Sequence, residues 1–369
     1  MFFQSLRRNI KRTLLKHLIR AIILNTQLHK NNVRLNGHFM PLKQKIFAFI
    51  HATILHWGSN MKISLTAAIA ALGLSGAAAA GTFGPLVTPQ ELASNLDQAN
   101  PIILDIRGEA YGEGHLPGAV PAPYSLFRGP STNPGQLLDV ATLEPRFEAL
   151  GLNFEQPIVI VHEGNSNSNF GAAARVYWTL KSTGFEDLTI LNGGKLAWEQ
   201  AGLPLETRVV EPSATELELV FSDDWTVTTP QVAEFAEGTD NVVLVDARLA
   251  DFYSGDTKHK AAARPGTVPG AINYAHYNFF DGDSPRVKTA FDVTALKAEL
   301  EIPDGAEVVS FCNTGHWAAT NWFALSEIGE IESVKLYPGS MVEYSNAELP
   351  MMNTPGLLDN LKSQLLGDG

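Results

Sequence analysis

Cysteine is almost absent from the chain: Cys312 is the only one in 369 residues, so no disulfide can form within it. The sequence also lacks a Cys pair, a His-Glu-x-x-His run and clustered histidines, and five of its ten histidines precede residue 61. These absences argue against a zinc-type site. No glycine-rich phosphate loop follows the apolar run that opens each half of the chain. We therefore expect neither a metal nor a cofactor.

Acidic residues are missing from residues 1–60, which hold ten of the 27 lysines and arginines. The rest of the chain carries 17 basic residues against all 39 acidic ones. Nucleic acid is bound by clustered Lys and Arg side chains, so this acidic remainder argues against a nucleic acid partner. The apolar run Ile63–Leu74 is too short to cross a bilayer.

Residues 61–80 have the three parts of a secretory signal peptide: Met61 with Lys62, the apolar run, and a stretch of Gly and Ala residues. We therefore expect translation to start at Met61 and residues 1–60 to be a non-native upstream extension. The processed protein would be exported, to the bacterial periplasm, without stable membrane insertion. The alternative is that residues 1–60 form a basic amphipathic arm on a membrane surface.

From residue 82 onward the chain repeats one order of motifs. Each copy has an apolar run ending in Asp-x-Arg, a Pro-Gly-Ala segment, a second apolar run, a helical pattern and a Leu-Pro pair. The matched positions are Asp105 and Asp246, Pro117 and Pro269, and Leu203 and Leu349. Alternating strands and helices predict an α/β fold of two domains, each with a mainly parallel sheet flanked by helices. We place domain 1 at residues 82–205, an acidic linker at 206–224, domain 2 at 225–352 and a tail at 353–369.

Cys312 stands between a β-branched apolar run, Val308–Phe311, and a helical pattern that begins near Ala318. This pattern predicts a strand, a short loop and a helix, with the thiol at the helix N-terminus. Unpaired backbone N–H groups and the positive end of the helix dipole favour a thiolate there. A lone cysteine is most often a small buried hydrophobe. The Gly-containing polar loop after Cys312 instead favours an anion-holding nucleophile.

With these motifs, and with the turn Tyr337-Pro338-Gly339-Ser340, residues 82–350 resemble the tandem-domain rhodaneses, the thiosulfate and 3-mercaptopyruvate sulfurtransferase family. The resemblance implies two rhodanese-like domains. It also implies that Cys312 takes sulfane sulfur from a small-molecule donor such as thiosulfate, as a persulfide, and passes it to a thiol, to cyanide or to a protein acceptor. Five loop residues would supply the amide cradle for the sulfur and the leaving anion: Asn313, Thr314, Gly315, His316 and Trp317.

The first copy departs from the second at the nucleophile. Aligning His162-Glu163 with Phe311-Cys312 puts a carboxylate in the place of the thiol. A carboxylate cannot accept sulfane sulfur, and the family's two-domain members likewise have a silent N-terminal copy. We therefore interpret domain 1 as a catalytically silent scaffold that walls the active site. A separate activity of His162 and Glu163 is the alternative.

Several residues could supply positive charge for an anionic donor. Arg248 is one candidate for substrate binding, although Asp246 two residues earlier favours an internal ion pair. Many family members carry a second Arg four residues after the first, where this chain has Phe252. The other candidates lie in the insertion that follows Tyr253: Lys258, Lys260 and Arg264.

His316 and Trp317 match neither of the family's better-known loop patterns. His316 could stabilise the thiolate as an imidazolium, and Trp317 could wall the pocket or stack under domain 1. Loop packing is the equal alternative for both residues.

Two other function classes fit part of the pattern. A Cys-dependent phosphatase also holds its thiolate at a helix N-terminus, but it needs an Arg after five intervening residues to clamp the phosphoryl group, and that position is Ala318. A persulfide carrier or binding module without turnover is the second alternative.

Processing of the chain yields the first prediction. The small residues before Gly81 are typical of a signal-peptide cleavage site, so the exported protein should begin at Gly81. N-terminal sequencing of native protein from the exported fraction measures this directly. Recovery of residues 1–60 on that protein would refute both the cleavage and the start at Met61.

Overall fold

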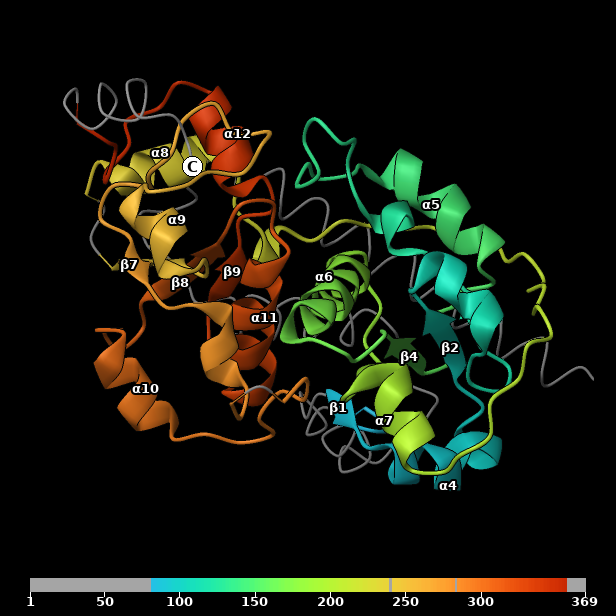
Figure 1. The fold of residues 1–369 in the computed structure, drawn as a ribbon. Coiled ribbons are helices and arrows are strands. Elements are labelled where there is room, and N and C mark those ends of the chain that lie inside the picture. Colours follow the sequence, from blue (N-terminus) through green and yellow to red (C-terminus); the bar gives the residue numbers. More distant parts are fainter. Residues whose placement is uncertain (1–80, 239–240, 283, 357–369) are drawn as a thin grey trace, which may run out of the picture. The chain divides into compact units, whose positions relative to one another are not determined.

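The computed structural model describes residues 81–356 except 239–240 and 283 (Figure 1). The expected extension at 1–60 and signal peptide at 61–80 lie outside the described residues, as does the tail from residue 357 onward. Within the described part, no helix is both long and apolar enough to span a membrane.

The first repeat contains a parallel sheet covered by helices. Its strand order is β1-β5-β4-β2-β3, with every recorded pairing parallel. Strands buried on both faces require continuous apolar runs, and β4 is Ile-Val-Ile-Val, fully buried. The strands are β1 (Leu86–Val87), β2 (Ile102–Asp105), β3 (Val120–Pro121), β4 (Ile158–Val161) and β5 (Leu188–Leu191). The helices are α4 (Pro89–Ala99), α5 (Val140–Ala149), α6 (Asn167–Ser182) and α7 (Gly194–Gln200).

The second repeat has the same topology. Its parallel sheet runs in the order β7-β6-β8-β9, and Thr226 forms a parallel bridge to Leu336 where β1 pairs with β5 in the first repeat. The strands are β6 (Val242–Asp246), β7 (Ile272–Asn273), β8 (Glu307–Phe311) and β9 (Val334–Leu336). The helices are α8 (Thr229–Ala236), α9 (Ala250–Ser254), α10 (Val293–Glu299), α11 (Trp317–Phe323) and α12 (Ser340–Asn346). The expected α/β fold with two parallel sheets is confirmed.

Local signals in the sequence account for the ends of several helices. Thr88 caps α4 by accepting from the amide of Glu91, whose carboxylate accepts from the Thr88 amide in return. Pro89 follows at the first helical position, where its missing N–H costs nothing. The capping box therefore sets the start of α4 at Pro89, directly after β1.

Helices α6 and α11 pack against each other and join the two repeats into one hydrophobic core, as the side-by-side helices in Figure 1 show. Phe170 of α6 meets Phe323 of α11 edge to face, with ring centroids 5.4 Å apart. Polar contacts extend this interface, because Glu327 accepts from the Tyr177 hydroxyl at 3.0 Å and pairs with Lys181 at 2.9 Å. The loop of residues 312–316, which precedes α11, therefore lies against the first repeat.

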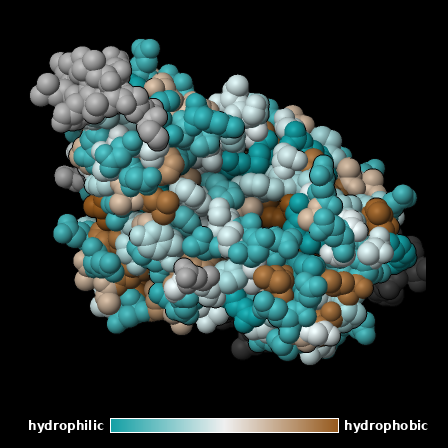
Figure 2. Space-filling model, viewed as in Figure 1, coloured by the Kyte–Doolittle hydropathy of each residue, from teal (hydrophilic) through white to brown (hydrophobic). Residues whose placement is uncertain are grey.

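The segment at 206–224, expected to be a linker, lies along the first repeat. The Leu219 amide donates to the Glu144 carboxylate at 2.8 Å, and the Ser222 amide donates to the Ser182 carbonyl at 2.7 Å. Leu219 itself is buried. The hydrophobic residues on the face shown in Figure 2 lie in small groups between hydrophilic ones.

Candidate active site

Cys312 follows the last residue of β8, at the carboxyl end of the parallel sheet, where α/β proteins place their sites. It is 1% exposed and belongs to the core shared by the repeats. Helix α11 begins at Trp317, one residue before the expected start, and continues into a π-helical turn at Ala324–Ile328. The loop of residues 312–316 thus connects β8 to a short, buried helix.

The Ser340 hydroxyl holds this loop in shape. It accepts from the amides of Cys312 and Gly315, both at 3.0 Å, and donates to the Tyr337 carbonyl at 2.8 Å. Ser340 adopts a φ of 51°, in the left-handed region that non-glycine residues rarely occupy. A backbone conformation that costs energy persists where the surrounding contacts demand it. The Tyr337–Ser340 turn therefore organises the loop as well as ending β9.

Gly315 is required by the close packing of the loop. Its φ is 64°, and a Cβ atom there would meet Arg175 Nη1 and lie 2.6 Å from the Pro338 carbonyl oxygen. No side chain larger than hydrogen fits without displacing the backbone.

Three other loop amides are open. Those of Asn313, Thr314 and His316 donate to no acceptor within the part of the chain that the structure describes. Cys312 and Gly315, by contrast, already use their amides on Ser340. Open amides next to a thiol are suited to hold negative charge. Of the five residues expected to form the cradle, Gly315 already uses its amide on Ser340, whereas Asn313, Thr314 and His316 have open amides, and Trp317 is the first residue of α11.

Arg248 lies behind the loop and is only 1% exposed. It pairs with Asp246 at 2.6 Å, donates to the Gly266 carbonyl at 2.9 Å and reaches Asn313 Oδ1 at 3.4 Å. The guanidinium is therefore occupied within the protein. These contacts match the internal ion pair expected from Asp246, and they link Arg248 to Asn313 of the loop.

The ring of His316 packs against the first repeat. Its Nε2–H donates to the Ser168 carbonyl at 2.8 Å, which leaves Nδ1 to accept from the Tyr124 hydroxyl at 3.0 Å. Burial, with Arg128 nearby, lowers the pKa of His316 to about 3. His316 is neutral at pH 7, so the expected imidazolium cannot assist the thiolate.

Trp317 lies between the repeats. Its indole N–H donates to the Ser168 hydroxyl at 3.0 Å, and its ring stacks on His276 with centroids 4.6 Å apart. Phe252, at the position of the family's second arginine, meets the same indole edge to face at 6.1 Å. The ring of Trp317 therefore stacks within the second repeat and not under domain 1, and only its indole N–H reaches the first repeat.

Two cations of the insertion after Tyr253 donate to backbone carbonyls of the second repeat. Lys258 donates to the Ala262 carbonyl at 2.7 Å, and Arg264 donates to the Leu349 carbonyl at 2.7 Å. Lys260 instead lines a cleft of about 760 Å³, together with Asn133 of the first repeat. Lys258 and Arg264 thus brace the second repeat.

The strand register corrects the alignment of the silent copy. Asp105 pairs with Val161 in the first sheet, and Asp246 pairs with Phe311 in the second. The residue after each strand is therefore His162 in one copy and Cys312 in the other, so the counterpart of the thiol is His162 and not Glu163. The expected alignment was wrong by one residue, because the loops that follow differ.

The silent copy holds these residues differently. His162 is 1% exposed, and burial lowers its pKa to about 3. Glu163 pairs with Arg107 at 3.1 Å, as Asn313 contacts Arg248 in the second repeat. Gly194 stands where the second repeat has Ser340, so the hydroxyl that shapes the catalytic loop is missing. The first copy therefore lacks both a thiol after its strand β4 and a hydroxyl in the position of Ser340.

Residues of the first repeat that contact the loop were not predicted: Tyr124, Ser168 and Arg175, with Arg128 over the Tyr124 ring. No motif marks them, since they approach the loop only through packing of the repeats. Ser340 was identified within a motif, but its role was not.

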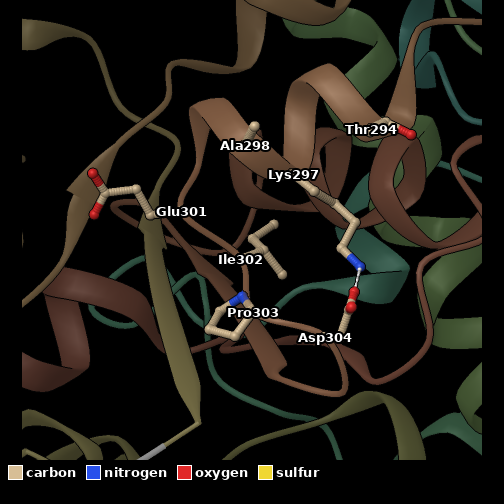
Figure 3. A pocket seen from close by; sticks show the side chains of 7 residues that line it. All are labelled: Thr294, Lys297, Ala298, Glu301, Ile302, Pro303 and Asp304. Carbon is tan, nitrogen blue, oxygen red and sulfur yellow. Dashed lines mark hydrogen bonds and ion pairs between the residues drawn. The ribbon is translucent and has the colours of Figure 1, made fainter.

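A hollow of about 410 Å³ beside α10 is unrelated to this site (Figure 3). Lys297 and Asp304 form an ion pair at 2.8 Å across it. None of its lining residues belongs to the loop of residues 312–316.

Comparison with known proteins agrees with this geometry. Residues 88–201 and 229–347 each match the family model of the rhodanese-like domain. A Mycobacterium tuberculosis protein named as a thiosulfate sulfurtransferase, SseB, is 30% identical over 274 residues, covering 71% of this chain and 94% of that protein. The 3-mercaptopyruvate sulfurtransferase of Escherichia coli is 27% identical over 275 residues, covering 70% and 95%.

Solved structures show the same fold. The crystal structure of SseA from Escherichia coli matches with a TM-score of 0.60 at 25% identity, over 70% of this chain and 98% of that one. The anaerobic ergothioneine biosynthesis enzyme from Chlorobium limicola matches with a TM-score of 0.64 at 20% identity, over 74% and 71%.

The chain belongs to the rhodanese-like family, with the domain in two copies. Its named relatives place it, at the level of class, among the sulfurtransferases.

Ser340→Ala tests the organisation of the loop. The amides of Cys312 and Gly315 would lose a buried acceptor, which should lower the free energy of unfolding by about 1–3 kcal/mol. Misplacing the loop should slow sulfur transfer about ten- to hundredfold. Ser340→Gly also lacks the hydroxyl but relieves the left-handed backbone, so it should lose less stability and as much activity. Wild-type rates in both variants would contradict the assigned role.

Acid should destabilise the protein through its buried histidines. The pKa values of His162 and His316 are lowered to about 3 and that of His276 to about 4, chiefly by burial. The unfolded chain therefore binds protons that the folded chain excludes, and stability should fall as the pH drops below about 6.5. Each such histidine contributes about 1.4 kcal/mol per pH unit.

Urea unfolding at pH 7 and pH 5 measures this loss. His316→Gln should lose about 2 kcal/mol less than the wild type on this change of pH, because it has no imidazole to protonate. An equal loss in the two proteins would show that His316 is not held neutral by burial.

Proposed function

We propose that the protein transfers sulfane sulfur from a small-molecule donor such as thiosulfate to a thiol or to cyanide, through a persulfide on Cys312. The observation that carries the proposal is the placement of a single thiol at the end of β8 beside three open loop amides. A cysteine kept only for packing would not need such a loop.

The chemistry balances in two steps. The Cys312 thiolate attacks the outer sulfur of thiosulfate, a new S–S bond forms, and sulfite leaves with the electrons of the broken bond. An acceptor thiolate or cyanide then attacks the outer sulfur of the persulfide and returns the Cys312 thiolate. The open amides of Asn313, Thr314 and His316 would hold the negative charge of the persulfide between the steps.

The named relatives support this class of donor, since thiosulfate and 3-mercaptopyruvate both occur in their names. A persulfide carrier would load sulfur without turnover, so steady-state transfer separates the two functions. The phosphatase alternative has no support at Ala318, a fully buried residue with no group to clamp a phosphoryl oxygen. We further propose that the enzyme acts after export, on the strength of residues 61–80.

Cys312→Ser tests the proposal. The variant should lose all transfer from thiosulfate to cyanide, because a hydroxyl of far higher pKa cannot carry sulfane sulfur. Intact-protein mass spectrometry after thiosulfate treatment should show one added sulfur atom on the wild type and none on the variant. Glu163→Gln is the matched control and should retain wild-type turnover, since Glu163 pairs with Arg107 within the silent copy. Full transfer by Cys312→Ser would overturn the mechanism.

A further inference from the structure

Two arginines of the first repeat approach the catalytic loop without a carboxylate partner. Arg128 follows the turn at Tyr124–Phe127, and Arg175 lies within α6. None of the ion pairs recorded among the described residues includes either guanidinium. Within residues 81–356, apart from the three undescribed positions, neither charge is thus paired with a carboxylate.

Arg175 contacts the loop directly. It is 1% exposed, its Nη1 donates to the Gly315 carbonyl at 3.3 Å, and its Nη2 donates to the Gly135 carbonyl at 3.3 Å. The guanidinium lies 4.8 Å from the centre of the Trp178 ring. Its Nε–H is buried and has no hydrogen-bond partner in the part of the chain that the structure describes. One donor of a buried cation is therefore unused.

Arg128 lies in the same region. Its guanidinium is 5.2 Å from the centre of the Tyr124 ring, and Tyr124 in turn donates to His316 of the loop. Its Nη1 is buried and, among the described residues, has no hydrogen-bond partner. Burial, and next the charge of Arg128, lowers the pKa of Arg175 to about 9, while Cys312 acts in the opposite direction. Arg175 thus contacts the loop directly, and Arg128 reaches it through Tyr124.

Two unpaired guanidiniums of like charge in a buried region are costly unless an anion joins them. Guanidinium groups bind oxyanions through parallel N–H donors, which fits the unused Nε and Nη1 atoms. In the second repeat, Arg248 is bound to Asp246, and the family's second arginine is replaced by Phe252.

We propose that Arg128 and Arg175 bind the anionic end of the sulfur donor, a dianion of the thiosulfate type, while Cys312 takes its outer sulfur. The proposal rests on the sulfur transfer described above and names its substrate class. In the transfer step the bond to the outer sulfur breaks and sulfite leaves as a dianion, so the same two cations would stabilise the leaving group. The silent repeat therefore supplies substrate-binding residues to the active site of its partner repeat.

Binding of thiosulfate to the full-length Cys312→Ser protein tests the proposal without turnover. Isothermal titration at constant ionic strength should give a dissociation constant that Arg128→Gln raises at least tenfold, about 1.4 kcal/mol. Arg128→Lys keeps the charge but loses the planar guanidinium, so its dissociation constant should lie between those of the parent and of Arg128→Gln. Arg208→Gln removes an arginine whose side chain is 81% exposed and should bind as the parent does. Pyruvate, a monoanion, should bind more weakly than thiosulfate and depend less on Arg128.

Equal thiosulfate affinity in the parent and in Arg128→Gln, with both proteins folded by circular dichroism, would overturn the proposal. Arg175→Gln provides a second test of thiosulfate binding, because it removes the unused Nε donor of the other arginine. The proposed function can fail independently of the anion site. If Arg128→Gln loses thiosulfate binding but the wild type transfers no sulfur, the anion site stands and the sulfurtransferase activity is rejected. If Arg128→Gln transfers sulfur with the wild-type KM for thiosulfate, only the anion site is rejected.

Discussion

The packing of α6 against α11 is the contact on which the rest of the structure depends. It joins two sheets of the same topology through one core in which Phe170 and Phe323 meet. Because the loop of residues 312–316 leads directly into α11, the same contact brings residues of the first repeat to the nucleophile. The first repeat, which has no cysteine, thus contributes contacts to the loop and helix that follow Cys312.

Within the second repeat, the loop is shaped by a hydroxyl in a strained backbone position. Ser340 satisfies the amides of Cys312 and Gly315 and leaves three neighbouring amides open. In the first repeat Gly194 occupies that position, with a φ of 61° and no strain. The two copies therefore differ at both the nucleophile and the residue that organises its loop, while their sheets and Asp-x-Arg ion pairs remain alike.

The features that could be predicted from the sequence are those that a short stretch of residues determines or that occur in both repeats. Apolar runs and the Asp-x-Arg ends predicted the strands, and the interrupted pattern around Cys312 predicted the strand, loop and helix to within one residue. What could not be predicted depends on contacts between distant segments. Burial of His316 under Tyr124 and Ser168 makes it neutral, and no local pattern reveals that burial. The placement of Glu163 opposite Cys312 was wrong because strand register, set by pairing across the sheet, decides which residue follows the strand.

A crystal structure of the protein soaked in thiosulfate would show directly whether Cys312 carries the transferred sulfur. We expect one additional sulfur atom bonded to Cys312 Sγ, facing the amides of Asn313, Thr314 and His316, with sulfite or thiosulfate between Arg128 and Arg175. Two results would contradict this mechanism. One is an unmodified Cys312 in the crystal although the same protein turns over thiosulfate in solution, and the other is a sulfur adduct on any other residue.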